Sequence, residues 1–336
     1  MLRSRCLRLV AVAFVMSALG ALGLCRAENL PPRALVVYHD SWNDFPAPSP
    51  ALSSLAALPS YLNVVNLAFA RPDLVYVGDL DLAMTGLEYR FTGQVLRDSI
   101  DLLKKRHPGT RVLLSVGGSG YSNWDAFNAP AVARLVRDLH ADGMDIDFEL
   151  RRANCTILPG GRTTCATDAV WANLVRRIRE VLPRPMLLTA SVWSVGAYGE
   201  GAFRAARPVS QYTGLMLSLL RSPLAGELDL LSINAYDAGP EYDPLEAFRA
   251  YRAVWPGPLA LGVEVQWKGG AGPFVGAAQA QALAREVAKD RNGAMMLYPL
   301  LSLPEGVGSA DRPDGRTLAT ALCRGLELAG CDAEAP

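Results

Sequence analysis

Short hydrophobic runs and longer amphipathic segments alternate along most of the chain. Eight runs rich in aliphatic and β-branched residues predict buried strands at 34–38, 62–69, 112–116, 144–148, 186–192, 228–235, 259–265 and 294–298. Apolar positions spaced three and four residues apart predict helices, most clearly at 93–106, 124–140, 168–181, 245–254, 277–289 and 318–328. Strands that alternate with helical crossovers pair in parallel, so the pattern indicates an α/β protein.

The number of repeats favours a closed barrel. Eight strand–helix units within about 300 residues fit a (β/α)8 TIM barrel better than a doubly wound sheet. An open sheet with an irregular extension is the alternative. The stretches 47–50 and 269–276, rich in proline and glycine, lie between predicted elements and have the composition of loops. No linker divides the chain, so we expect one domain over residues 28–336.

The first residues have the pattern of a secretory signal. Three arginines among the first eight residues precede an apolar run at 9–24, and small-residue character returns at Ala27. This order predicts a signal peptide over residues 1–27 and a secreted or periplasmic protein. An uncleaved anchor is the alternative, although the run is slightly short of the roughly 18 residues of a spanning helix. Attachment as a lipoprotein through Cys25 fits less well, because Leu24 is bulky.

The cysteines suggest disulfides. Of six cysteines, four follow the predicted cleavage point, as the close pairs Cys155 with Cys165 and Cys323 with Cys331. In an exported protein such pairs most simply predict two local disulfides. Zinc is the rival ligand, but the spacings are wider than C-x-x-C and the pairs lie far apart. The three histidines form no ligand-like cluster, so we expect no metal and no cofactor.

The composition excludes several classes of protein. Half of the residues (50%) are hydrophobic and 20% are charged, which is typical of a chain that buries a large core and not of a disordered or collagenous one. With 33 basic and 33 acidic residues, the chain has no cationic excess to neutralise phosphates. Nucleic acid is therefore not an expected partner, and a neutral ligand remains open.

The segment from Asp142 to Glu149, DGMDIDFE, carries the most chemical information. In a strand, Asp145, Asp147 and Glu149 line one face, and the apolar residues between them line the other. In a barrel these carboxylates would face the interior and rise toward the carboxyl-terminal mouth, where barrel enzymes place their chemistry.

Three carboxylates this close cannot all stay ionised in a pocket of low dielectric constant, so one can remain protonated near neutral pH. A protonated carboxylic acid is what general acid catalysis requires. The alternatives are a solvated acidic face and a calcium or magnesium site. Parallel barrel strands are covered on both faces, and a metal loop would show a glycine turn where residues 150–152 are Leu-Arg-Arg.

The acidic segment resembles the D-x-x-D-x-D-x-E signature of glycoside hydrolase family 18, the family of chitinases and endo-β-N-acetylglucosaminidases. Further segments resemble other family motifs in the expected order: 38–42 its first-strand aromatic end, 114–118 its S-x-G-G, and 234–237 its M-x-Y-D. The resemblance spans residues 34–300 and implies a TIM barrel. It also implies that Ser115, Gly117 and Gly118 let the third strand pack closely beside the acidic one.

The resemblance further implies hydrolysis with retention, because this family uses the sugar's own 2-acetamido oxygen as the nucleophile. Glu149 would protonate the departing glycosidic oxygen and then activate water. Asp147 would orient the acetamido group and stabilise the cationic intermediate, and Asp145 would share a proton with Asp147. The hydroxyl of Tyr236 would hold the acetamido oxygen, although a core tyrosine is its alternative. Asp142 would be structural.

Other aromatic and polar residues near predicted strand ends could bind the sugar. These are Tyr38, Trp42, Trp193, Asn234, Asp237, Glu264, Gln266, Trp267 and Tyr298. Each aromatic residue could instead pack in the core, and Glu264 and Gln266 could belong to a hydrogen-bonded barrel network. Asp237 could equally cap its loop.

Two positions depart from the family pattern. Members usually carry a tryptophan at the end of the eighth strand, beneath the sugar that is cleaved, and here Leu297 stands at that place beside Tyr298. Asn234 replaces the methionine of M-x-Y-D. Either Tyr298 or another aromatic residue substitutes for the tryptophan, or this subsite has a different shape. Both changes leave the acids intact but put a standard chitin chain in doubt as the substrate.

The leading hypothesis is an exported, monomeric glycoside hydrolase. Its partner would be an oligo- or polysaccharide that contains β-linked N-acetylglucosamine, with no membrane contact beyond the signal segment. A lectin-like protein on the same barrel is the alternative, although such relatives usually lack the acid that Glu149 provides. A metal-dependent hydrolase with the acidic strand as its ligands is a third hypothesis.

Overall fold

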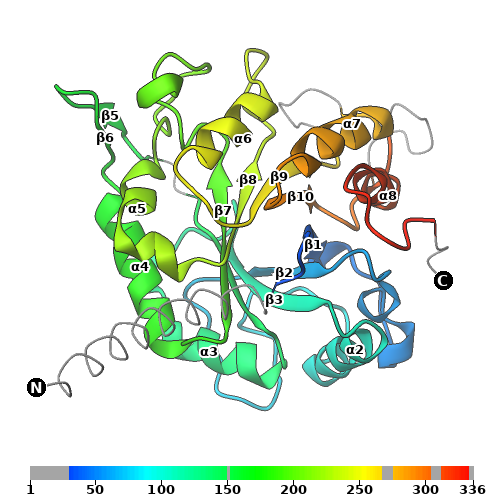
Figure 1. The fold of residues 1–336 in the computed structure, drawn as a ribbon. Coiled ribbons are helices and arrows are strands. Elements are labelled where there is room, and N and C mark those ends of the chain that lie inside the picture. The colour runs from blue at the N-terminus through cyan, green and yellow to red at the C-terminus, as the bar shows by residue number, and fades with distance from the viewer. Residues whose placement is uncertain (1–29, 150–151, 267–274, 304–311, 333–336) are drawn as a thin grey trace, which may run out of the picture.

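A closed barrel of eight parallel strands forms the centre of the molecule. The computed structural model describes residues 30–149, 152–266, 275–303 and 312–332. The barrel strands are β1 Leu35–Asp40, β2 Val64–Ala70, β3 Arg111–Gly117, β4 Gly143–Asp147, β7 Leu187–Trp193, β8 Leu230–Asn234, β9 Leu259–Glu264 and β10 Gly293–Tyr298. Around the barrel they follow the order β1-β10-β9-β8-β7-β4-β3-β2 (Figure 1). The predicted (β/α)8 architecture is confirmed, while the signal peptide predicted at 1–27 lies outside the described residues.

Helices surround the barrel (Figure 1). They are α2 Gly93–Arg106, α3 Ala129–Asp138, α4 Asp168–Val181, α5 Leu217–Arg221, α6 Pro244–Arg252, α7 Ala277–Ala288 and α8 Gly315–Gly325. Between β1 and β2 the described chain makes three short 3-10 turns in place of an α-helix: Ser41–Asn43, Pro50–Leu52 and Leu55–Ala57.

The helix predicted at 124–140 is split in two. A 3-10 turn covers Trp124–Ala126, and α3 begins only at Ala129. Asn128 caps α3, because its side-chain oxygen accepts a hydrogen bond from the backbone N–H of Ala131 at 3.3 Å. Pro130 in the first turn has no N–H to lose, so the helix starts there at little cost.

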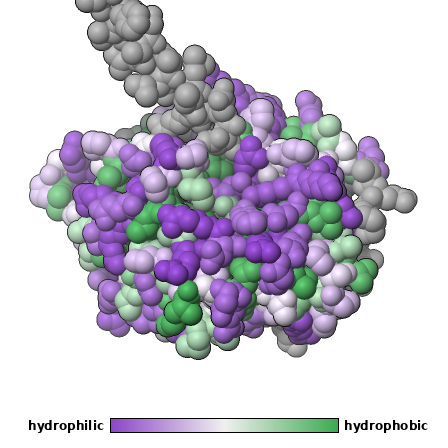
Figure 2. All heavy atoms as spheres, turned by 90° about the horizontal axis from the view of Figure 1, so that it is seen from below, coloured by the Kyte–Doolittle hydropathy of each residue, from purple (hydrophilic) through white to green (hydrophobic). Residues whose placement is uncertain are grey.

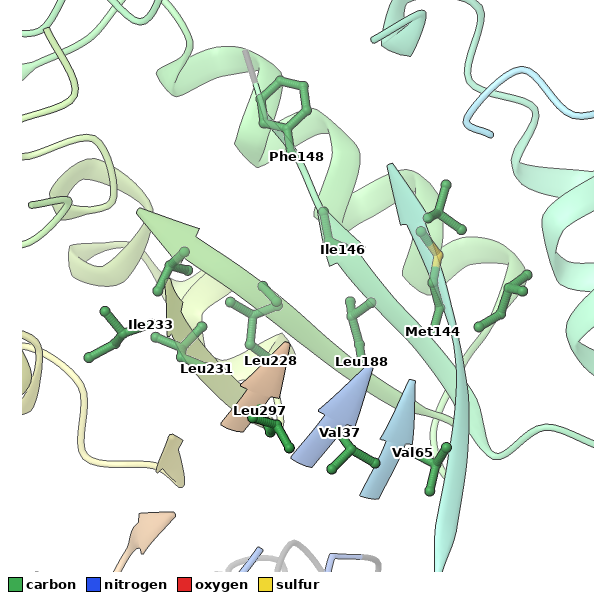
Figure 3. Packing of buried hydrophobic residues seen from close by; sticks show 14 of the residues in the cluster. Val37, Val65, Met144, Ile146, Phe148, Leu188, Leu228, Leu231, Ile233 and Leu297 are labelled. Atoms are coloured by element: carbon green, nitrogen blue, oxygen red, sulfur yellow. The ribbon is translucent and has the colours of Figure 1, made fainter. Parts of the chain in front are cut away.

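Each strand sends alternate side chains to two different cores. One core lies between the strands and the helices, and Figure 3 shows part of it, including Val37, Val65, Ile146 and Leu297. The other core fills the barrel itself. It includes Val36, Tyr38, Val64, Leu113, Leu187, Leu230, Ala260 and Met296. Because side chains alternate along a strand, every second residue of each hydrophobic run points into the barrel.

Both predicted disulfides are confirmed, Cys155 with Cys165 and Cys323 with Cys331. The first closes a small antiparallel hairpin of β5 Thr156–Ile157 and β6 Thr163–Thr164, which follows the acidic strand.

One face of the molecular surface is largely polar. The face shown in Figure 2 is mainly hydrophilic, and its hydrophobic residues are scattered instead of gathered in one patch. Among the described residues, no helix combines the length and the apolar character needed to cross a membrane.

Candidate active site

The acidic strand lies between β3 and β7, with its carboxylates directed into the barrel as predicted. Ile146 and Phe148 point the other way, where the ring of Phe148 meets Trp124 and Trp171 edge-on at 5.2 and 5.1 Å between centroids. This apolar anchoring fixes β4 against the helices. Asp145, on the opposite face, has no exposed surface.

Three hydroxyl groups converge on Asp145. Its Oδ2 accepts hydrogen bonds from the hydroxyls of Tyr38 at 2.9 Å and Ser115 at 2.8 Å. Its Oδ1 accepts one from Thr189 Oγ1 at 2.6 Å. Burial raises the pKa of Asp145, while these three hydrogen bonds lower it because they stabilise the charged form. Asp145 is therefore a buried carboxylate with its charge compensated by dipoles from β1, β3 and β7.

Asp147 and Glu149 are both poised to hold a proton. Burial raises the pKa of Asp147 well above its usual value, and the charges of Glu149 and Asp145 raise it further. Burial also raises the pKa of Glu149, as does the charge of Asp237. Within the described chain, no group of three or more His, Cys, Asp or Glu side chains is arranged to hold a metal ion.

A cavity of about 270 Å³ opens above these acids at the carboxyl ends of the strands. Its lining includes nine of the residues predicted for the site: Tyr38, Asp147, Glu149, Trp193, Asn234, Tyr236, Asp237, Glu264 and Tyr298. Ser119 and Ser194 also line it and were not predicted, because a lone serine in a loop carries no pattern. Larger cavities of about 510 and 550 Å³ lie at the amino ends of the strands.

Asn234, the residue that replaces a methionine, organises the polar wall of the cavity. Its Oδ1 accepts hydrogen bonds from Ser191 Oγ at 2.8 Å and from the Tyr236 hydroxyl at 3.1 Å. Burial and the charge of Asp147 raise the pKa of Tyr236, so this hydroxyl stays a donor. The substitution thus gives the tyrosine hydroxyl a partner two residues away.

Leu297, which stands at the place of the usual tryptophan, does not face the cavity. Leu297 has no exposed surface and belongs to the outer core, with Val37 and Val65 (Figure 3). Side chains alternate along β10, so the residue that faces the cavity is Tyr298. The ring of Tyr298 lies roughly parallel to that of Tyr236, 6.1 Å away and at 15°.

Trp42 and Gln266 are described but do not line the cavity. Trp42 stacks on Phe69 at 5.8 Å and 19°, and Phe69 in turn contacts the rings of Tyr38 and Tyr298. Gln266 is half-buried just beyond β9 and is not part of the cavity lining. Trp267 lies outside the described residues.

Gly117 allows β3 to approach the acidic strand closely, as expected. Its φ is +115°, and a side chain there would collide with the backbone carbonyl of Asp147. The next residue, Gly118, donates its N–H to that same carbonyl oxygen at 2.9 Å. The two glycines therefore hold the backbone of Asp147 in place.

Fold and site together define a (β/α)8 barrel of the glycoside hydrolase type, with its carboxylates at the carboxyl ends of the strands. The model of the glycosyl hydrolases family 18 matches residues 34–217, which is more than half of the 336-residue chain. The chain belongs to this family. No curated protein sequence matches it significantly.

Solved structures share the fold at low sequence identity. A GH18 chitinase from Pseudoalteromonas aurantia is 20% identical, with a TM-score of 0.60 over 87% of this chain and 100% of that one. A mutant of catalytic domain 2 of the Ostrinia furnacalis Group II chitinase, in complex with penta-N-acetylchitooctaose, is 16% identical over 91% and 98%, with a TM-score of 0.57. A chitinase-like agglutinin from Robinia pseudoacacia is 13% identical over 87% and 99%, with a TM-score of 0.55.

Proposed function

We propose that the chain is an exported glycoside hydrolase that cleaves glycans containing β-linked N-acetylglucosamine, with retention and with assistance from the substrate. The observation that carries this proposal is the shared cavity of Asp147, Glu149 and Tyr236, with Asp145 buried behind them. The raised pKa of Glu149 favours a protonated general acid near neutral pH.

In the first step, the acetamido oxygen of the bound sugar attacks the anomeric carbon of the same ring. The glycosidic bond breaks, and its oxygen takes the proton of Glu149. Asp147 orients the acetamido N–H and faces the positive charge of the oxazolinium ring. Tyr236 turns its hydroxyl from Asn234 to the acetamido oxygen. This directed hydrogen bond holds the acetamido oxygen in place for its attack.

In the second step, Glu149 is a carboxylate and acts as the base. It takes a proton from a water molecule, whose oxygen attacks the anomeric carbon from the side that the leaving group occupied. The oxazolinium ring opens, the acetamido group is restored, and Glu149 ends protonated for the next cycle. Two inversions at the anomeric carbon give net retention.

Asp145 controls where the shared proton resides. Three hydroxyl donors favour the ionised form of Asp145, so the proton rests on Asp147 before the reaction. As positive charge develops on the sugar, the proton moves toward Asp145 and Asp147 becomes the carboxylate that faces the cation.

The relatives and the disulfides support the substrate class and the export. The similar Ostrinia furnacalis structure holds an N-acetylglucosamine oligomer, which supports a related ligand here. Two disulfides fit a protein that matures in an oxidising compartment, consistent with a cleaved signal at 1–27.

The test is the Glu149→Gln variant, assayed on N-acetylglucosamine oligomers, glycoproteins and bacterial wall fragments with products identified by mass spectrometry. Removal of the acid should lower kcat/KM about 10³-fold, within the usual range for general acid–base catalysis. Glu180→Gln is the matched control, because Glu180 is exposed on α4, and it should match the wild type.

Two outcomes would contradict the proposal. A wild-type protein that binds oligosaccharide without cleaving it would instead be a lectin-like protein, and the similar chitinase-like agglutinin makes that outcome worth testing. An initial product with the α-anomeric configuration, seen by NMR, would exclude retention.

A further inference from the structure

An aromatic pair stands at the edge of the cavity on one side. Trp193 ends β7 and lines the cavity together with Ser194 and Glu149. Its ring stacks on that of Tyr212, with centroids 3.9 Å apart and planes 7° from parallel. Tyr212 comes from the loop between β7 and α5 and is not part of the cavity lining. It contacts the cavity wall by stacking on the ring of Trp193.

The strand register places this pair beside Glu149. Ile146 of β4 pairs with Ala190 of β7, so Glu149, three residues further along, lies level with Trp193. Burial raises the pKa of Tyr212, and the one carboxylate that raises it further is Glu149. For Tyr236 and Tyr298, the largest cause after burial is the charge of Asp147. Glu149 also contributes to the raised pKa of both tyrosines, but Tyr298 belongs to β10 and Tyr236 follows β8, farther round the barrel from the acidic strand than β7. The Trp193–Tyr212 pair therefore lies on the Glu149 side of the cavity.

The proposed mechanism gives Asp147 and Glu149 different roles. Asp147 serves the acetamido group of the sugar that is cleaved, whereas Glu149 serves the oxygen that departs. The Trp193–Tyr212 pair consequently lies on the side of the leaving group. A broad aromatic face there suits the apolar face of a pyranose ring.

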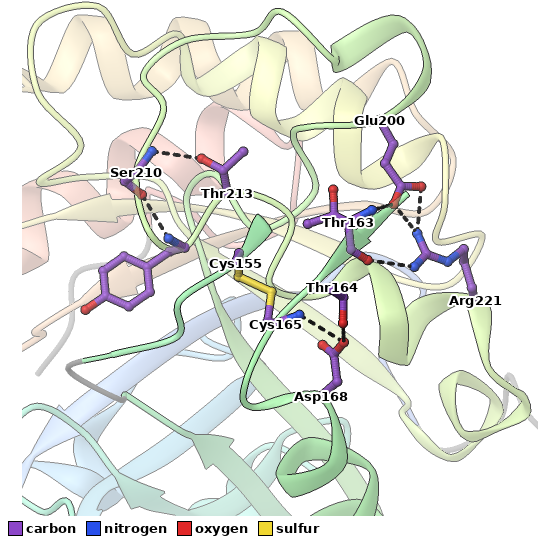
Figure 4. The surroundings of a disulfide bond; sticks show 10 residues. Cys155, Thr163, Thr164, Cys165, Asp168, Glu200, Ser210, Thr213 and Arg221 are labelled. Carbon is purple, nitrogen blue, oxygen red and sulfur yellow. Dashed lines mark hydrogen bonds and ion pairs between the residues drawn. A yellow bond between two sulfur atoms is a disulfide. The ribbon is translucent and has the colours of Figure 1, made fainter. Parts of the chain in front are cut away.

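The disulfide hairpin holds Tyr212 in place at two points. At the first, the backbone N–H of Cys155 donates to the carbonyl of Gln211, the residue before Tyr212, at 3.0 Å. The Cys155–Cys165 bond fixes that N–H on the hairpin (Figure 4). The loop also braces itself, because Tyr212 donates its N–H to Ser210 Oγ at 3.2 Å.

The second point is a close approach of Gly214 to Thr163 on β6. Gly214 has φ +84°, and a Cβ there would come within 2.5 Å of Thr163 Cγ2. Thr163 is itself fixed, because its N–H donates to Glu200 and its carbonyl accepts from Arg221 at 3.3 Å. Glu200 and Arg221 form an ion pair at 2.6 Å, so the hairpin, the loop and α5 make one braced unit (Figure 4).

We propose that Tyr212 is a positioning residue that holds Trp193 as the platform for the sugar on the leaving-group side, and that the Cys155–Cys165 hairpin secures it. This inference rests on the proposed function and deepens it. The preferred substrate is then an oligomer that continues beyond the cleaved bond on its reducing side, and the protein discriminates against leaving groups that have no ring.

The test compares two substrates with the same donor sugar, tetra-N-acetylchitotetraose and chitobiosyl fluoride. The fluoride leaves without occupying a platform. Tyr212→Ala should lower kcat/KM for the tetramer about five- to tenfold, mainly through KM, which is the size expected for one aromatic pair. The same variant should change kcat/KM for the fluoride less than about twofold.

Four further variants sharpen this comparison. Tyr212→Phe keeps the ring and should retain the wild-type preference, and Tyr212→Leu replaces Tyr212→Ala if the alanine variant does not fold. Phe45→Ala is the control, because Phe45 is a 77% exposed aromatic residue outside the cavity lining. The double change Cys155→Ser with Cys165→Ser should reproduce the tetramer defect, with little further loss when combined with Tyr212→Ala.

Equal losses on both substrates, or no loss on either, would overturn the role of Tyr212 while leaving the hydrolase function intact. A disulfide variant with an unchanged tetramer preference would overturn the role of the hairpin. A wild-type protein that cleaves glycoproteins or wall fragments but neither of these two substrates would overturn the inference alone. A wild-type protein that cleaves nothing in the whole panel would refute the proposed function, and the inference with it.

Discussion

Asp145 and Asp147 are two residues apart on the same strand face and yet have different electrostatic surroundings. Asp145 receives three hydroxyl hydrogen bonds, whereas the main influences on Asp147 are burial and two neighbouring carboxylates. The folded protein therefore prefers a neutral Asp147. That preference has a consequence for stability as well as for catalysis.

Stability should fall with rising pH because of Asp147. Its pKa is raised in the folded protein, so above about pH 4 the unfolded chain releases a proton that the folded chain keeps. The free energy of unfolding then decreases by up to about 1.4 kcal/mol per pH unit until the folded pKa is passed. Asp147→Asn removes this dependence, so the variant should gain stability relative to the wild type between pH 4 and 7.

Urea unfolding at several pH values measures this difference. Asp125→Asn is the control, because Asp125 is an exposed carboxylate outside the cavity lining, and its curve should run parallel to that of the wild type. A curve for Asp147→Asn that also runs parallel would show that Asp147 titrates alike in the folded and unfolded chains.

At the scale of elements, the contact between β3 and β4 is sensitive to side-chain size at Gly117. Gly117→Ala adds a methyl group against the carbonyl of Asp147 and requires an unfavourable positive φ. We expect a loss of about 3 kcal/mol in the free energy of unfolding, together with lower kcat because Asp147 shifts. Chemical denaturation and steady-state kinetics measure the two effects.

Gly120→Ala provides the comparison three residues further along the chain. Nothing lies within 4 Å of a Cβ at Gly120, so this change should alter stability by no more than about 0.5 kcal/mol. Similar losses of stability for the two variants would contradict this explanation. They would mean that the backbone preference of glycine, and not its close contact with the carbonyl of Asp147, explains the requirement for glycine.

Sequence patterns captured the elements that depend on local periodicity. The helices at 93–106 and 168–181 have the predicted bounds, and all eight runs became barrel strands. The short helix α5 was missed, because five residues are too few to show a period of 3.6. The first crossover has three 3-10 turns in place of an α-helix. One of them begins at Pro50, and a proline inside a helix would remove a backbone hydrogen bond.

The site was predictable where alternation decided it and not where tertiary contacts did. Asp147 and Glu149 follow from the period of a strand, and Tyr298 follows from its place beside Leu297 at the end of the eighth strand. The support that Tyr212 gives to Trp193 could not be predicted, because it depends on a loop held by a hairpin distant in sequence.

At the scale of the whole molecule, the two disulfides lie at opposite ends of the barrel. Cys155–Cys165 belongs to the cavity end, beside the loop of Tyr212. Cys323–Cys331 closes the end of α8, where the neighbouring Gly330 approaches Ser60, a residue that precedes β2. One disulfide should therefore affect substrate preference, and the other only stability.

The double change Cys323→Ser with Cys331→Ser should lower the free energy of unfolding by about 2 kcal/mol, as expected for a short disulfide loop. It should leave kcat/KM for N-acetylglucosamine oligomers unchanged. Urea unfolding and initial rates, run on the same preparation, measure both quantities. A fall in kcat/KM at a temperature where the variant is fully folded would show that α8 communicates with the cavity.

The hydroxyls around Asp145 have one more consequence. They come from β1, β3 and β7, so only the closed barrel assembles them, and each already points at the carboxylate. Water around a carboxylate must rotate its dipoles whenever the charge changes, whereas these dipoles are oriented once, during folding. The reorganisation energy that a solvated acid would add to every turnover is thereby largely removed.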